Sequence, residues 1–143
     1  MLFRSVRDDN QLDYDNYPDI AGYSIGVYGP SNTSASLEKI ANIVSIKVEM
    51  TPDDESAFRK LAGKRIDAVF SNKDVGWAML KKMGIKNVRY GGKYKQLNYY
   101  IGFSRKYNNK EVIDRFNHTL AQLYSQGKIR KILDSYQVDS AKL

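Results

Sequence analysis

The sequence predicts an α/β fold in which a parallel-type sheet is sandwiched by helices. Apolar runs at 23–28, 45–50 and 66–71 are each followed by turn residues and then by a segment with apolar residues at helical spacing. Strands and helices that alternate in this way form a sheet covered on both faces. The 143 residues, of which 42% are hydrophobic, are sufficient for one folded domain with a core.

Local signals place the elements in order. An apolar opening at 1–6 leads into a polar, proline-containing connector. The first helix is expected after the turn at 29–34, and the second after Thr51, the expected N-cap. The third follows 72–74 and stops at Gly84. The remaining elements are expected to be a short strand at 88–90, a Gly91-Gly92 turn, a strand at 97–103 and two helices separated by Gly127.

Composition and charge argue against several classes of function. The formal net charge of +7 invites a nucleic-acid interpretation, but the basic residues are scattered and accompany no recognised DNA or RNA motif, so no nucleic-acid partner is expected. Cysteine is absent, which excludes disulfides, thiol catalysis and Cys-ligated zinc. No stretch approaches the roughly 20 apolar residues of a membrane span, and no signal peptide is recognised in the chain.

Two turns are candidates for chemistry. In open parallel α/β sheets, ligands collect outside the carboxyl ends of the strands, where the unpaired amides of helix N-termini favour negative charge. The turn at 29–34 offers small residues, hydroxyls and amides, and the turn at 71–74 ends the third strand. Local sequence alone favours a simpler interpretation of both turns, a loop plus an N-cap. Neither contains a P-loop or a GxGxxG pattern, so nucleotide binding has little support.

Catalytic and metal sites are not expected. His118 is the single histidine and has no Ser or Asp constellation near it in the sequence. The acids Asp53, Asp54 and Glu55 fall in the first turn of a helix, where the helix dipole accounts for them without a metal ion. Trp77 falls inside a helix and is interpreted as a packing residue. The chain is therefore not expected to be an enzyme, and no cofactor or metal is predicted.

Five stretches, in order along nearly the whole chain, carry a resemblance to a known family. Residues 19–34, DIAGYSIGVYGPSNTS, place a D-L-x-G-like entry before a strand and a Gly/Ser/Thr turn, and residues 61–76, LAGKRIDAVFSNKDVG, are similar to an L-x-x-G-R-I-D-A-V signature. Residues 99–106, YYIGFSRK, residues 112–133 and Tyr136 complete the set. Together they resemble the C-terminal half of bacterial extracellular solute-binding proteins of family 3, the substrate-binding proteins of amino-acid ABC transporters, which have the type II periplasmic-binding fold.

The resemblance implies a binding site at the two turns. Amides and hydroxyls of the first turn would hold a ligand carboxylate. Where the family commonly places an aspartate that pairs with an ammonium group, this chain has Asn72, whose amide carries no charge. The expected ligand-binding residues are Gly29, Ser31, Asn32, Thr33, Asn72 and Asp74.

The resemblance also implies a domain organisation. Residues 1–19 would be a hinge strand and connector, 20–96 the α/β lobe two, and 97–143 a returning hinge strand with C-terminal helices that belong to an otherwise missing lobe one. The apolar residues of those helices are expected to be covered by a second copy of the chain.

The function implied is a periplasmic, non-enzymatic module that binds an amino acid or small carboxylate, weakly because lobe one is incomplete, for a membrane permease or a sensor. The alternative is an interaction or dimerisation domain that derives from such a receptor and has lost ligand binding. A third class, an enzyme related to the few dehydratases of this fold, lacks paired acids or a histidine constellation in the expected cleft.

Overall fold

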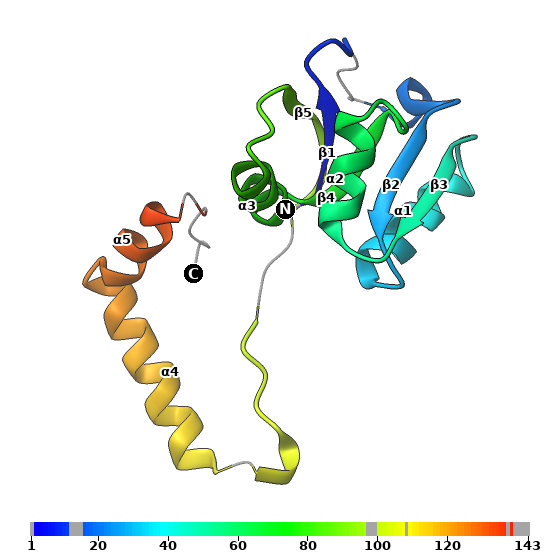
Figure 1. Ribbon diagram of the computed structural model, residues 1–143. Coiled ribbons are helices and arrows are strands. Elements are labelled where there is room, and N and C mark those ends of the chain that lie inside the picture. Colours follow the sequence, from blue (N-terminus) through cyan, green and yellow to red (C-terminus); the bar gives the residue numbers. More distant parts are fainter. Residues whose placement is uncertain (1, 12–15, 97–99, 108, 137, 139–143) are drawn as a thin grey trace. The chain divides into compact units, whose positions relative to one another are not determined.

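The chain divides into two compact units, unit 1 (Met1–Leu97) and unit 2 (Asn98–Leu143). Figure 1 shows the elements of both units in the computed structural model. The residues that it describes are 2–11, 16–96, 100–107, 109–136 and 138. Unit 1 contains, in order, β1 (Leu2–Arg7), a 3-10 helix (Tyr17–Ile20), β2 (Ser24–Tyr28), α1 (Asn32–Ala41), β3 (Lys47–Thr51), α2 (Asp54–Ala62), β4 (Ala68–Asn72), α3 (Lys73–Met83) and β5 (Val88–Lys95).

The sheet of unit 1 has the strand order β3-β2-β4-β1-β5. β2 runs parallel to β3 and β4, as the alternation of strands and helices predicts. β1 runs antiparallel to both β4 and β5, so the sheet is mixed rather than purely parallel. The predicted α/β class is confirmed. Because β2, β3 and β4 are parallel, they end at one edge of the sheet, the carboxyl edge, and begin at the opposite one, the amino edge.

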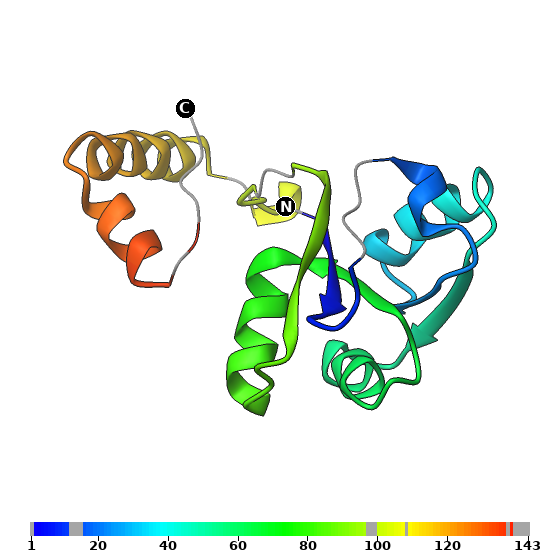
Figure 2. The ribbon, with the colours of Figure 1, turned by 90° about the horizontal axis from the view of Figure 1, so that it is seen from above.

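Helices cover both faces of the sheet (Figure 2). Leu37 and Ile40 of α1 pack on one face, and α2 and α3 pack on the other. Side chains alternate along the strands, so that Phe70 belongs to the first core while its neighbour Val69 belongs to the second. The most deeply buried large side chains are Phe58, Phe70, Ile20, Ile25, Leu37, Ile40, Leu61 and Ile66.

The N-cap of α2 is Asp53, not Thr51. The Asp53 carboxylate accepts a hydrogen bond from the Ser56 amide at 2.6 Å. Thr51 instead ends β3 and is buried, and its hydroxyl donates to the carbonyls of Val27 at 3.2 Å and Asp53 at 2.9 Å. The prediction was wrong because both residue types cap helices well, and only burial of the strand end distinguishes them.

The N-cap of α3 is Asn72, and Asp74 lies inside the first helical turn. The sequence left open whether Asp74 was the cap, and the structure excludes that. Asn72 has extended backbone angles, and its side chain makes no capping hydrogen bond. The predicted stop at Gly84 is confirmed, since Gly84 has φ of +65°, a conformation that glycine adopts without a side-chain clash.

β5 continues through Gly91 and Gly92, where the sequence predicted a turn. The register with β1 shifts there: Arg4 pairs with Gly92 and Ser5 with Tyr90, which leaves Gly91 as an extra residue. Two glycines accommodate such a bulge because they carry no side chain to clash as the strand bends. A glycine pair alone does not distinguish a bulge from a turn.

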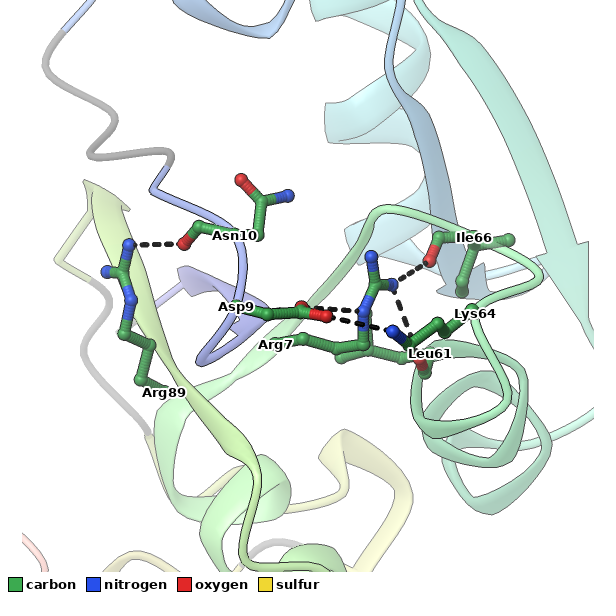
Figure 3. Close-up of polar contacts among 7 residues, drawn as sticks. All are labelled: Arg7, Asp9, Asn10, Leu61, Lys64, Ile66 and Arg89. Carbon is green, nitrogen blue, oxygen red and sulfur yellow. Dashed lines mark hydrogen bonds and ion pairs between the residues drawn. The ribbon is translucent and has the colours of Figure 1, made fainter.

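The end of β1 is tied to the turn that joins α2 to β4 (Figure 3). The Arg7 guanidinium donates to the carbonyl of Ile66 at 3.0 Å, to that of Leu61 at 3.5 Å and to the carboxylate of Asp9 at 3.0 Å. Lys64 also contacts Asp9 at 3.0 Å, and this bond, aided by Arg7, lowers the pKa of that carboxyl. β1, which the sequence assigned to a hinge strand, pairs with β4 and β5 in the sheet of unit 1, and its hinge role stays a prediction.

Unit 2 contains a 3-10 helix (Arg105–Tyr107), α4 (Lys110–Ser125) and α5 (Lys128–Ser135). The predicted pair of helices is confirmed, and Gly127 between them has φ of +69°. Phe103 and Phe116 meet edge to face with ring centroids 5.3 Å apart. None of the described residues of α4 or α5 is buried.

The strand predicted at 97–103 is not found where the structure can test it. Residues 97–99 lie outside the described part of the chain, and 100–103 have no regular secondary structure. A β-branched and aromatic run favours a strand only when a neighbouring strand accepts its backbone hydrogen bonds. Within the described residues, no such strand pairs with 100–103.

Candidate functional site

The start of α1 follows β2 at the carboxyl edge and is organised by a reciprocal cap. The Ser31 hydroxyl accepts from the amide of Ser34 at 3.1 Å and donates to the carbonyl of Tyr28 at 2.7 Å. The Ser34 side chain in turn accepts from the Ser31 amide at 2.9 Å. The Ser31 hydroxyl is therefore occupied within the protein, and its contribution to a site would be to fix the start of the helix.

The backbone N–H groups that have no acceptor within α1 at this helix start belong to Asn32 and Thr33. They are the first two residues of α1, and helix geometry gives the N–H groups of these positions no intrahelical acceptor. Asn32 is exposed and Thr33 is half-buried. Two adjacent amides, with the positive end of the helix dipole behind them, form a place that suits a carboxylate or phosphate.

The start of α3 lies at the same edge because β2 and β4 are neighbours. Their parallel ladder pairs Gly26 with Val69, and Gly29 and Asn72 each lie three residues further along. Asn72 and Asp74 are half-buried. The structure thus brings the two predicted turns together at one edge of the sheet, as the sequence predicts for parallel strands.

Apolar side chains flank the start of α1. Tyr28, the last residue of β2, is 44% exposed, and Met50 of β3 is 47% exposed. Gly29 packs closely against Ser34 and Met50: a Cβ at this position would lie 3.0 Å from Ser34 and 3.1 Å from the Met50 sulfur. Any larger residue would have to displace these neighbours. The alternation of β2 and β3 is a sequence signal for Tyr28 and Met50, but they were not predicted as site residues.

The start of α2 brings carboxylates to this edge. Burial raises the pKa of the Asp54 carboxyl, and the neighbouring Asp53 adds to the effect. The amide of Ser56 holds the pKa of Asp53 below its usual value. Asp54 and Glu55 lie in the first turn of α2, as the sequence predicts, whereas Asp53 is its N-cap. Among the described residues, no group of three His, Asp or Glu could hold a metal ion.

A tyrosine from β5 braces the start of α3. The Tyr90 hydroxyl donates to the carbonyl of Lys73, the first residue of α3, at 3.2 Å. Burial raises the pKa of Tyr90, with a smaller effect from Asp74, so the phenol stays protonated and keeps its donor. Trp77 meets Tyr90 edge to face at 5.4 Å but is 46% exposed, so its packing is partial.

Large hollows of unit 1 lie away from these turns. One of about 640 Å³ runs between α2 and the end of α3, and another of about 510 Å³ is lined by Arg7, Tyr23 and Asp67 near the amino edge. Neither is lined by residues 29–33 or 72–74. We place the candidate site at the carboxyl edge because two helix starts meet there beyond neighbouring parallel strands, the place where open α/β sheets collect ligands.

The architecture is similar to that of solved amino-acid-binding proteins. An ancestral arginine-binding protein bound to arginine matches with a TM-score of 0.75 and 24% identity, over 94% of this chain and 59% of that one. Substrate-binding domain 2 of GlnP from Lactococcus lactis, in an open conformation, matches with a TM-score of 0.72 and 21% identity, over 97% and 59% of the two chains. Unit 1 has the fold of lobe two of a type II periplasmic-binding protein.

The extent of the match is also informative. Domain 2 of the arginine-binding protein from T. maritima matches with a TM-score of 0.55 and 21% identity, over 66% of this chain and 97% of that domain. The chain spans 59% of the length of the two longer periplasmic-binding neighbours. No protein-family model matches the sequence, and no curated protein matches it. At these identities the neighbours show the fold alone.

Proposed function

We propose that this chain is a solute-binding module of an ABC-type uptake or sensory system. It would bind a small anionic or amino-acid-like solute at the carboxyl edge of unit 1. The neighbours support this proposal, since two of them are named as arginine-binding and substrate-binding proteins. The observation that carries it is the convergence of two helix starts, those of α1 and α3, beyond neighbouring parallel strands.

In this proposal the N–H groups of Asn32 and Thr33 hold the carboxylate of the solute. Gly29 keeps the turn compact, and Ser31 holds the helix start through its cap. Tyr28 and Met50 would line the apolar part of the solute, because both are half-exposed beside the turn. Helix amides favour an anion without requiring a charged side chain.

At the start of α3, Asn72 and Asp74 would hold the other end of the solute. The Asn72 amide can donate and accept hydrogen bonds but brings no charge. Asp74 supplies a carboxylate in the same helical turn, and it would pair with an ammonium group if the solute is an amino acid. A neutral or anionic solute would use Asn72 alone.

Binding by unit 1 would be weak, and it would work through a second protein surface that closes over the solute. One edge of a sheet buries little of a solute, whereas ligand sites commonly bury most of their guest. The proposed location is extracytoplasmic, with a membrane permease or sensor as the partner that reads the closed state. Among the described residues, no helix has the length and apolarity to cross a bilayer.

A thermal-shift panel of amino acids and small carboxylates tests the proposal. A solute that binds only the native state at 100 times its dissociation constant stabilises it by about 2.7 kcal/mol. A saturable rise in melting temperature for at least one solute is expected. No response across the panel would contradict solute binding and would favour the interaction-domain alternative.

The substitution Asn32→Pro tests the site itself. Proline is favoured at the first position of a helix, and the extended angles of Ser31, φ −158° and ψ 168°, suit a residue that precedes proline. The variant therefore removes one N–H while keeping α1, and the affinity for the solute should fall about tenfold, as for one charge-assisted hydrogen bond. Lys110→Pro, at the same position of α4, is the matched control and should bind normally. Equal affinity in both variants would contradict the site.

The helices of unit 2 support a second proposal, that the chain forms a homodimer through α4 and α5. Val112, Ile132 and Tyr136 are 51%, 56% and 77% exposed, and burial of each such side chain contributes about 1.5 to 3 kcal/mol. Light scattering of Val112→Asp/Ile132→Asp beside the unaltered chain tests this. A dimer for the unaltered chain and a monomer for the variant are expected, and a monomeric unaltered chain at high concentration would contradict it.

A further inference from the structure

A groove on unit 1 combines an apolar floor with basic side chains in its lining. It lies between α2 and the end of α3 and has a volume of about 640 Å³. Ala62, Met83 and Ile85 are half-buried in its floor. Arg59, Lys60 and Arg65 also line it.

Basic residues around this groove outnumber the carboxylates that neutralise them. Glu55 contacts both Arg59, at 2.6 Å, and Lys82, at 2.9 Å, so one carboxylate serves two cations. Glu49 is likewise shared between Lys60, at 2.9 Å, and Lys47, at 3.2 Å.

Three further cations, Arg65, Lys81 and Lys86, are exposed and make no ion pair within the described part of the chain. We call these three the basic rim; Arg65 lines the groove itself, and Lys81 and Lys86 lie at the end of α3 and in the turn that follows it.

Helix electrostatics explain only part of this cluster. Lys81 and Lys82 lie in the last turn of α3, where cations stabilise the negative end of the helix dipole. Lys64, Arg65 and Lys86 lie one or two residues beyond the C-caps Gly63 and Gly84, in the turns that lead into β4 and β5, where the effect of the dipole falls off. Figure 3 shows Lys64 in the turn between α2 and β4, paired with Asp9. Lys64 is neutralised by Asp9, so Arg65, Lys81 and Lys86 leave a net positive charge at these two helix ends.

The topology places this charge at the amino edge of the sheet. α1, α2 and α3 all end there, because the strands that follow them, β3, β4 and β5, run in the same direction. Ile43, in the turn after α1, is 67% exposed at the same edge. Basic side chains together with an exposed isoleucine, spread over three turns, suit an extended anionic surface with an apolar interior.

We propose that the amino edge of unit 1 docks on an anionic phospholipid surface through the basic rim and Ile43. The rim side chains contact lipid phosphates, and the floor of the groove receives the less polar part of a headgroup. This arrangement directs the carboxyl edge away from the bilayer. It does not depend on which solute, if any, binds at the carboxyl edge.

Sedimentation of the full chain with lipid vesicles tests this docking. The probes are vesicles of equal parts phosphatidylglycerol and phosphatidylcholine, with pure phosphatidylcholine vesicles for comparison. The chain should bind the first and not the second at low salt, and binding should weaken at about 0.15 M salt, where the Debye length is about 8 Å. Each basic residue near such a surface strengthens binding about fivefold, so Arg65→Gln/Lys81→Gln/Lys86→Gln should bind roughly a hundredfold more weakly.

A control variant with the same loss of charge separates the effect of the basic rim from the effect of net charge. Lys93→Gln/Lys95→Gln/Lys128→Gln removes three exposed cations elsewhere and should bind like the unaltered chain. Equal losses in the two triple variants, or no binding to phosphatidylglycerol vesicles, would overturn the proposal. Rim-dependent binding to the acidic polymer polyglutamate without binding to vesicles would also overturn it, and would identify an acidic protein as the partner.

Discussion

The two units of this chain differ in how much of their apolar surface they cover. Unit 1 closes two cores on either side of its sheet, with Phe58 and Phe70 fully buried. The described part of α4 and α5 in unit 2 buries no residue, although Phe116 is partly covered by Phe103. The difference indicates that unit 1 is stable through its own packing, whereas the helices of unit 2 need a covering surface to gain comparable stability.

The largest expected effect comes from equivalent truncations in the two units. Phe58→Ala should lower the free energy of unfolding of unit 1 by about 3 to 5 kcal/mol, because it leaves a cavity between α2 and α3. Phe116→Ala should leave this value almost unchanged in the monomer. Trp77 is the single tryptophan, so urea unfolding followed by its fluorescence reports on unit 1. Comparable losses from the two variants would show that the units share one core.

Loss of a helix cap should also lower the stability of unit 1 only when the cap belongs to unit 1. The effect should be smaller than that of Phe58→Ala. Ser31→Ala removes the cap of α1 and should cost unit 1 about 1 kcal/mol by the same Trp77 measurement. Asn109, which accepts from the Glu111 amide at 3.0 Å, caps α4. Asn109→Ala should reduce helicity in circular dichroism without moving the Trp77 transition. A shift of that transition by Asn109→Ala would contradict the prediction and would show that α4 contributes to the stability of unit 1.

Ser5 has an unsatisfied hydroxyl within the well-packed unit 1. Its hydroxyl is buried and has no hydrogen-bond partner in the structure. Ser5→Ala removes this oxygen while keeping the Cβ, and it should stabilise unit 1 by up to about 1 kcal/mol. Thr51→Val is the control, since the Thr51 hydroxyl is bonded to two carbonyls, and it should destabilise by about 1 to 2 kcal/mol. Destabilisation by Ser5→Ala would show that its hydroxyl has a partner.

Substitution of Asp54 should give the smallest change in stability, and this change should depend on pH. Because its pKa is raised in the folded state, the folded protein binds this proton more tightly than the unfolded chain does. Stability therefore falls as pH rises from the ordinary aspartate pKa, 3.8, through the raised value. Asp54→Asn should be more stable than the unaltered chain at neutral pH by less than about 1 kcal/mol, since solvent screens a half-exposed group.

The gain from Asp54→Asn should vanish near pH 3, where the unaltered carboxyl is protonated in both states. Urea titrations at the two pH values measure this difference. A gain that is independent of pH would contradict the assigned cause.

The sequence was most informative where local signals and burial agree. The α/β order, the helix of unit 1 that stops at Gly84 and the two helices around Gly127 follow from periodicity and glycine positions. The convergence of Gly29 and Asn72 follows from parallel strands alone.

What the sequence left undetermined depends on pairing partners far along the chain. The antiparallel insertion of β1, the bulge at Gly91 and the choice of Asp53 over Thr51 as a cap are all set by which strand lies next to which. The half-exposed side chains Tyr28 and Met50, which belong to the proposed site, were not predicted as parts of it, because strand patterns do not show which ends remain uncovered.

Amide chemical-shift mapping tests the proposed binding edge most directly. A solute that raises the melting temperature is added to the isotope-labelled chain, and its effect on each amide is followed by NMR. The account predicts the largest changes at Asn32 and Thr33, with smaller ones at Asn72 and Asp74. Changes confined to the amino edge, around Gly22 and Tyr23, would contradict it.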